Sequence, residues 1–140
     1  MDFTIRQIIG VTIWWIEGSK SRKDKRWKNA VSYPVEVTNT NPEMIQLFLD
    51  FLRNDIGVQE ERLKIQIQIH EDNDKEECEQ FWSQITKIPR HRFNQTIVRP
   101  IGKKKGKTKG TCKIRYIDKD TYSRVVQLFE NIKTGCSSVG

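Results

Sequence analysis

Apolar residues recur along the chain with two different spacings, and together these spacings predict a sheet packed against helices. A spacing of three and four residues is typical of one helix face, and strict alternation is typical of a half-buried strand. The helical spacing predicts four helices, which begin near residue 2, Asn41, Asn73 and Asp118 or Asp120. Alternation predicts strands near 31–37, 63–70, 95–101 and 111–117, with a further short strand before residue 29. This order predicts an α+β fold, in which an antiparallel or mixed sheet has one polar surface and helices pack on the other.

Local signals at the helix ends support these boundaries. Asn41 is followed by a proline, a combination typical of a helix start, and Gly57 is expected to end that helix. Asn73 and Glu76 have the spacing of a capping box for the third helix. Gly135 is expected to end the last helix, so we divide the chain into one domain and a flexible tail, residues 1–135 and 136–140.

The first helix is apolar on all sides and ends on an acid. One side carries Ile5, Ile8, Ile9, Thr12, Ile13 and Ile16, and the other carries Val11, Trp14 and Trp15. A helix of this kind is expected to be buried on both faces. Its last residue is Glu17, and Gly18 can adopt the left-handed conformation that ends a helix. Because the helix dipole disfavours an anion there, Glu17 needs another stabilising partner, for which a divalent metal ion is one candidate.

Positive charge is concentrated in two short segments. The net charge of +7 comes from 25 Lys and Arg against 18 Asp and Glu. Residues 20–28 and 99–109 together hold 12 of those 25 bases and one acid, so the rest of the chain, with 13 bases and 17 acids, has a net charge of −4. One such segment is commonly a solvated loop, but two of them on an otherwise acidic chain favour a polyanionic partner.

The outward positions of the predicted strands strengthen this interpretation. They carry residues that can donate to base edges and phosphates, and a two-stranded ribbon fits the major groove of B-DNA. An ordinary solvated sheet face is the alternative. Single-strand RNA readers use exposed aromatic residues, whereas Tyr33 and Tyr116 fall on the apolar phase, which favours duplex DNA without excluding RNA. The predicted DNA-binding residues are Lys20, Arg22, Lys23, Lys25, Arg26, Lys28, Ser32, Thr38, Lys64, Gln66, Gln68, His70, Lys103, Lys104, Lys105, Lys107, Lys109 and Arg115.

Other sequence features bear on the cellular compartment, on bound zinc or cofactors, and on membrane insertion. Cys78, Cys112 and Cys136 form neither a CxxC pair nor a disulfide framework, which predicts a reducing compartment, either cytoplasmic or organellar. His70 and His91 lack the spacing of a structural zinc site. No apolar run approaches the length of a membrane span, and no small-molecule cofactor is expected.

The first helix and its Glu17-Gly18 end resemble the motif helix of the LAGLIDADG homing endonucleases. The family motif ends in Asp-Gly, and here Val11 and Thr12 stand where the family has Ala and Gly, and Trp15 where it has its first Asp. The order of elements is similar over most of the chain, although the third helix is additional. Only one such motif is present, so the resemblance is to the single-motif, homodimeric type. In such proteins the motif helices pair across a twofold axis, which implies a dimer interface formed by Ile8, Val11, Thr12, Trp14 and Trp15.

The resemblance also implies a set of catalytic residues. Glu17 and Gly18 would bind Mg²⁺, or another divalent cation such as Mn²⁺ or Ca²⁺, and Glu36 would help position a water molecule. Arg99 is the best match to the basic residue near the cleaved phosphate, and Lys113 is the second choice. The implied activity is hydrolysis of both strands of a near-palindromic DNA site.

Two other functions stay open. Glu17 is one methylene longer than the usual Asp, and degenerate motifs also occur in non-cleaving DNA-binding proteins and in maturase-like RNA-splicing helpers on the same scaffold. A protein-interaction domain without a nucleic-acid role is the third possibility. The affinity of such a domain for its partner would not have the steep salt dependence that phosphate contacts produce.

Overall fold

Helix α1 begins where the sequence provides its cap. The computed structural model describes residues 3–19, 22–23, 31–100 and 109–139, and α1 spans Ile5–Glu17. The Thr4 hydroxyl accepts a hydrogen bond from the backbone N–H of Gln7, and the Gln7 side chain accepts one from the backbone N–H of Thr4. This reciprocal arrangement is a capping box. The helix therefore begins later than the predicted residue 2.

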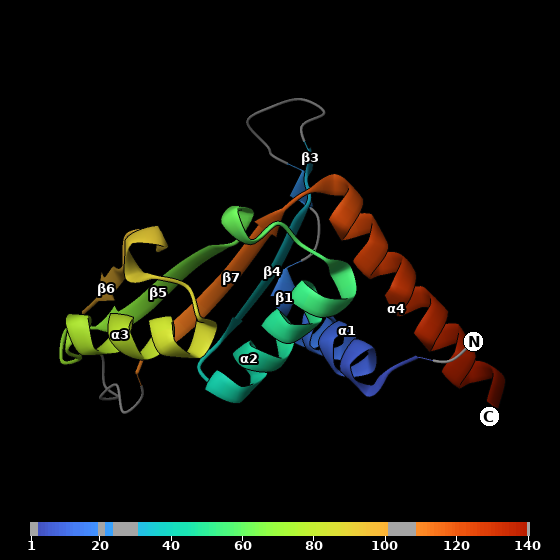
Figure 1. Cartoon of the computed structure of the whole chain (residues 1–140), viewed down its shortest axis with the longest axis horizontal. Coiled ribbons are helices and arrows are strands. Elements are labelled where there is room, and N and C mark those ends of the chain that lie inside the picture. The colour runs from blue at the N-terminus through green and yellow to red at the C-terminus, as the bar shows by residue number, and fades with distance from the viewer. Residues whose placement is uncertain (1–2, 20–21, 24–30, 101–108, 140) are drawn as a thin grey trace.

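Five strands form the main sheet, in the order β1-β4-β7-β5-β6 (Figure 1). Their bounds are Gly18–Ser19 for β1, Pro34–Asn39 for β4, Lys64–His70 for β5, Ile97–Arg99 for β6 and Thr111–Ile117 for β7. Neighbouring strands are antiparallel except β5 and β6, which are parallel. A separate two-stranded ribbon pairs β2 (Arg22–Lys23) with β3 (Val31–Ser32). The predicted α+β class with a mixed sheet is confirmed.

The helices cover the apolar side of this sheet. The helix α2 spans Pro42–Phe51, continues as a π-helical turn over Leu52–Ile56, and ends at Gly57 with φ of 76°. Helices α3 and α4 span Lys75–Thr86 and Lys119–Val139, and 3₁₀ turns occur at Glu60–Arg62 and Arg90–Arg92. Figure 1 shows α1, α2 and α3 along one side of the strands, and α4 begins near the β3 end of β4 and runs away from the sheet past α1.

Two predicted helix ends are wrong. Asp74 caps α3, because its side chain accepts a hydrogen bond from Glu77 N–H, while Asn73 accepts one from His70 N–H and shapes the preceding turn. The last helix continues through Gly135 to Val139. An interior glycine is an unfavourable helix residue but does not by itself end a helix.

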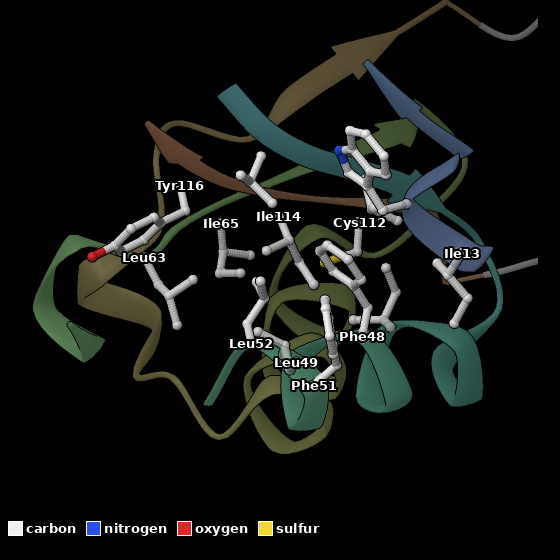
Figure 2. Packing of buried hydrophobic residues seen from close by; sticks show 14 of the residues in the cluster. Ile13, Phe48, Leu49, Phe51, Leu52, Leu63, Ile65, Cys112, Ile114 and Tyr116 are labelled. Carbon is white, nitrogen blue, oxygen red and sulfur yellow. The ribbon is translucent and has the colours of Figure 1, made fainter. Parts of the chain in front are cut away.

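The core lies between the inward strand residues and the helices. Figure 2 shows Ile65 and Ile114 of the sheet directed toward Phe48 of α2 and Leu52 of the π-helical turn that follows it. The expected buried face of β5 is confirmed, since Leu63, Ile65, Ile67 and Ile69 are at most 1% exposed. Cys112 is also in this core, and its burial raises the thiol pKa to about 12. Such a thiol packs as a small apolar residue and is a poor nucleophile.

Candidate nucleic-acid interface

Polar side chains form rows across the outward face of the sheet. In the antiparallel register Glu36 of β4 lies opposite Arg115 of β7, and Arg115 lies opposite Lys64 of β5. Thr38, Lys113 and Gln66 form the adjacent row in the same way. We call this surface the polar sheet face; its members on the described strands are Glu36, Thr38, Lys64, Gln66, Gln68, His70, Arg99, Thr111, Lys113 and Arg115.

The remaining members of the polar sheet face lie on β5 and on the two strands that pair with it, β7 and β6. Gln68 lies opposite Thr111 of β7, and His70 is in register with Arg99 of the parallel strand β6. Lys64 and Gln68 are exposed, while the Gln66 amide donates to the carbonyl of Gln95 at 3.0 Å. The sequence prediction missed Thr111, although it has the same strand phase as Lys113 and Arg115.

Glu36 is the member of the face whose environment is most unusual. Its exposed fraction is 7%, yet it is a carboxylate on the polar side of the sheet. Its Oε2 lies 2.8 Å from Arg115 Nε and its Oε1 lies 3.7 Å from Lys113 Nζ, so the carboxylate forms ion pairs with both cations. Both cations are much more exposed than the carboxylate they contact. A buried carboxylate needs such partners, because the loss of hydration is otherwise uncompensated.

Glu17 reaches the edge of the same face through Gly18. Strand β1 follows α1 directly, and its register pairs Gly18 with Val37 and Ser19 with Glu36. Glu17 is exposed, and in the described part of the chain its carboxylate has no hydrogen bond or ion pair. The first helix therefore delivers its acid beside the strand that carries Glu36.

The reason for glycine at position 18 differs from the prediction. Gly18 has φ of −88° and ψ of 153°, an extended conformation that any residue adopts, so the expected left-handed end of α1 is wrong. Glycine is needed there for space. An added Cβ would lie 2.2 Å from the Trp14 carbonyl oxygen and 2.9 Å from that of Glu36.

The order of strands separates the two candidate basic residues. Lys113 on β7 is the direct neighbour of β4 and contacts Glu36. Arg99 lies on β6, at the edge of the sheet opposite β1, with β7 and β5 between it and β4. The structure therefore does not bring Arg99 to Glu17 and Glu36. Lys113, the second choice from the sequence, lies beside Glu36, as does Arg115.

The predicted DNA-binding residues fall into four groups. Thr38, Lys64, Gln66, Gln68, His70 and Arg115 share the polar sheet face. Lys109 forms an ion pair with Glu77 of α3, and this hydrogen bond raises the pKa of Lys109. For Arg22, Lys23 and Ser32 the structure describes the backbone alone, in β2 and β3. The residues outside the described part of the chain are Lys20, Lys25, Arg26, Lys28, Lys103, Lys104, Lys105 and Lys107.

Helix α1 is buried on one side only. Val11 and Trp14 are 1% exposed and belong to the core of their own chain, so the prediction that they form a dimer interface is corrected. The opposite side is open: Ile8 is 40% exposed, Trp15 52% and Ile16 68%. Trp15 also stacks on Phe129 of α4, with ring centroids 4.3 Å apart. We call this surface the α1 apolar stripe; it consists of Ile5, Ile8, Thr12, Trp15 and Ile16.

The ligands available to a cation are few within one chain. Among the described residues, no three His, Cys, Asp or Glu side chains gather into a metal-binding group. At the end of α1, the oxygen donors are the Glu17 carboxylate and the Gly18 carbonyl. Mg²⁺ commonly takes one or two carboxylates and completes its coordination with water and substrate phosphates. The donor set therefore fits Mg²⁺ bound together with a nucleic acid, and fits poorly with a closed structural site.

Comparison with known proteins adds no second line of evidence. The chain matches no family model, no curated protein and no solved structure. Within the part of the chain that the structure describes, no helix has the length and apolar character needed to cross a membrane. Functional conclusions therefore depend on the polar sheet face, the end of α1 and the α1 apolar stripe.

Proposed function

We propose that this protein is a homodimeric, sequence-specific endonuclease of the LAGLIDADG type that acts on double-stranded DNA. One observation carries the proposal: the same helix, α1, places Glu17 at the edge of the polar sheet face and presents an exposed apolar stripe. A single chain leaves both features incomplete, since it provides one carboxylate and no cover for the stripe. A second copy would complete both.

The chemistry of the face favours a duplex over a single strand. Its rows consist of Lys, Arg, Gln and Thr, which donate to phosphates and to base edges in the major groove. Aromatic residues for base stacking are absent from the strand positions of this face that the structure describes. Tyr116 points to the other side and is 3% exposed, and its hydroxyl accepts from Gln59 N–H at 3.1 Å.

The α1 apolar stripe favours a second copy as partner. Ile5, Ile8 and Ile16 follow one another along the helix, with exposed fractions from 40% to 76%. A run of large apolar side chains on a regular helix marks an interaction surface more often than isolated exposed residues do. A twofold axis through this stripe would bring two polar sheet faces and two Glu17 residues together, and symmetric dimers match near-palindromic sites.

The residues near Glu17 have separable roles in the proposed reaction. Glu17 and the Gly18 carbonyl would hold Mg²⁺, and Mn²⁺ or Ca²⁺ suit the same oxygen ligands. When bound, Mg²⁺ supplies Lewis-acid activation of water and stabilisation of the leaving oxygen. In the proposed complex Lys113 would contact the phosphate, and Gln66, Gln68, Lys64 and Arg115 would contact bases.

A second candidate is a non-cleaving DNA-binding protein or splicing helper on the same scaffold, and the position of Glu36 favours it. In the resemblance Glu36 would position a water molecule. Here both of its carboxylate oxygens face cations, at 2.8 Å and 3.7 Å. Because both oxygens already face cations, the carboxylate is less available to position a water molecule, and this supports binding without cleavage as the alternative.

Cleavage under controlled metal supply separates the two candidates. A duplex target selected from a random-sequence library is incubated with the protein and Mg²⁺, and a parallel sample contains EDTA. The nuclease proposal predicts cleavage of both strands, loss of cleavage with EDTA, and loss of cleavage with retained binding for Glu17→Gln. Glu43→Gln, which removes one acid from α2 on the opposite side of the sheet, should cleave normally. Tight binding with no cleavage under Mg²⁺ or Mn²⁺ would support the second candidate.

A further inference from the structure

The outward face of the sheet ends in a row that is apolar. Pro34 of β4 lies opposite Ile117 of β7, one row beyond that of Arg115. Side chains of β7 alternate between the core and the outward face, and Ile117 has the outward phase because Tyr116 before it is buried. Ile117 is 51% exposed, and among the strand side chains that the structure describes it is the most exposed apolar one.

The backbone at Ile117 is held in place from two sides. Its carbonyl accepts a hydrogen bond from Nη2 of Arg62 at 2.7 Å, and the N–H of the next residue, Asp118, donates to the carbonyl of Tyr33 at 3.4 Å. Asp118 also forms an ion pair with Arg62, with Oδ1 and Nη1 3.6 Å apart. Isoleucine is β-branched, which restricts its χ1 angle. Ile117 therefore presents a fixed apolar surface at the end of the face.

An aliphatic side chain on a surface that binds the major groove has one favourable partner there. Base edges in the major groove present hydrogen-bond donors and acceptors, and thymine alone adds a methyl group. Contact between this methyl group and Ile117 removes apolar surface of both from water. Contact with the amino group of cytosine would instead desolvate a polar group without a hydrogen bond, which is costly.

We infer that Ile117 contacts the 5-methyl group of a thymine in each half of the DNA site and is therefore a specificity-determining residue. The inference rests on the proposed binding of duplex DNA by the polar sheet face, but it does not require cleavage. It adds an apolar contact to a face whose other members act through charge and hydrogen bonds.

The register of the sheet also predicts where that thymine lies. Because β1 pairs Gly18 with Val37, and β7 pairs Ile117 with Pro34, Ile117 lies farther than Arg115 from the end of α1. Outward side chains two residues apart on a strand are separated by about 6.8 Å, roughly twice the rise of one base pair. With β7 along the groove, the thymine lies about two base pairs farther from the centre of the site than the base pair at Arg115.

The first test uses deoxyuridine, which pairs as thymidine does and lacks only the 5-methyl group. A duplex target is selected with the wild-type protein, and each of its thymidines is replaced in turn by deoxyuridine. Replacement of one particular thymidine in a half-site should lower affinity about fourfold, the effect expected for one buried methyl group. This thymidine should lie about two base pairs outside the position at which Arg115→Gln changes the base preference.

Variants of Ile117 identify the side chain that is responsible. Ile117→Ser should bind the thymidine and deoxyuridine duplexes with equal affinity at that position, whereas Ile117→Val, which keeps an apolar β-branched side chain, should retain most of the difference. Leu47→Ala is the matched control, since it shortens an exposed aliphatic side chain on α2, and it should retain the whole difference. Thermal unfolding shows whether each variant keeps the fold, and the wild-type measurement depends on none of them.

An ordinary solvated isoleucine would produce no dependence on a thymine methyl group. A target in which no thymidine shows this dependence, or a dependence that folded Ile117→Ser retains, would overturn the role of Ile117 and leave the proposed DNA binding in place. Failure of the wild-type chain to bind any duplex would overturn both.

Discussion

Gly10 sets the distance at which α1 crosses α2. Gly10 is buried. A Cβ added to it would lie 2.1 Å from Cγ and 2.5 Å from Cβ of Phe51. Phe51 is itself fully buried, so its ring has little room to move. This close approach fixes the height of α1 over the sheet and hence the position of Glu17 at its end.

Replacing Gly10 by alanine should therefore destabilise the protein. Overfilling of a packed core costs about 1–3 kcal/mol, and we expect a loss of that size in urea unfolding followed by circular dichroism. Gly135→Ala in α4 is the matched control. Its new Cβ would meet the Phe3 ring at 3.7 Å, an ordinary contact. Alanine in place of an interior helix glycine should raise stability by about 0.5–1 kcal/mol. Equal effects at the two positions would show that space around Gly10 is not limiting.

Single residues were predictable from the sequence where one local signal decides the structure. Asn41 accepts from the N–H groups of Glu43 and Met44, as its position before a proline indicates. Asp74 was missed because Asn73 and Asp74 are adjacent, equally good caps, and the turn that selects between them includes a hydrogen bond from His70. Gly10 was not predictable as a contact position, since its neighbour Phe51 is distant in sequence, and the same holds for the approach of Gly18 to Glu36.

At the scale of elements, ion pairs and hydrogen bonds of charged side chains connect the helices to neighbouring segments. Arg53 in the turn after α2 donates from Nε and Nη2 to the two oxygens of Glu60, at 3.0 and 2.6 Å. Its Nη2 also donates to the carbonyl of Thr86 at the end of α3, at 2.8 Å. One guanidinium thus connects α2, α3 and the 3₁₀ turn that leads into β5.

This connection should make stability depend on pH. The hydrogen bond from Arg53 lowers the pKa of Glu60 below its ordinary 4.5, so folding favours the ionised form. The resulting stabilisation is present above about pH 4.5 and is lost as pH falls through the lower pKa of the folded state. Glu60→Gln should therefore have a lower free energy of unfolding than the wild type at neutral pH. This difference should become smaller as the pH falls below 4.5.

Denaturant unfolding at a series of pH values checks this, with Glu61→Gln as control. Glu61 is the next residue and is exposed, so its replacement should leave the wild-type pH dependence in place. A difference between wild type and Glu60→Gln that stays constant from neutral to acidic pH would contradict the role given to Arg53.

The elements themselves were largely predictable, but their pairing was not. Alternation identified β5 and β7 because both strands have one apolar and one polar side. The sequence contains no comparable signal that β6 runs parallel to β5, since this pairing depends on the path of the chain through α3. For that reason the sequence predicted Arg99 beside Glu36, whereas in the structure Lys113 lies beside Glu36.

At the scale of the whole molecule, the account requires two copies of the chain. The apolar side chains of α1 were expected to be buried on both faces, and the structure buries one face within the chain. The open face is the α1 apolar stripe. Sequence periodicity could not show which side chains of α1 belong to the core and which face a partner, because Val11 and Trp14 are as apolar as Ile8 and Trp15.

A charge within the stripe should separate the two copies. Ile8→Glu places a carboxylate at a position that is 40% exposed in the single chain and would be covered in the dimer. Light scattering behind size-exclusion chromatography should show the mass change from two chains to one chain of 16.5 kDa. Ile117→Glu, at an exposed isoleucine of β7, should leave the mass unchanged. A wild-type protein that is monomeric at all concentrations would contradict the proposed homodimer.

The polar sheet face as a surface for duplex DNA is the central claim, and the salt dependence of affinity tests it most directly. The measurement is the equilibrium constant of the wild-type protein for its selected duplex at about 50 and about 200 mM salt, where six to ten phosphate contacts lower affinity by about 10³ to 10⁵. The account predicts a loss in that range, with a linear log–log plot between the two concentrations. An affinity that stays constant over this interval, or the absence of any duplex binding at the lower salt concentration, would contradict it.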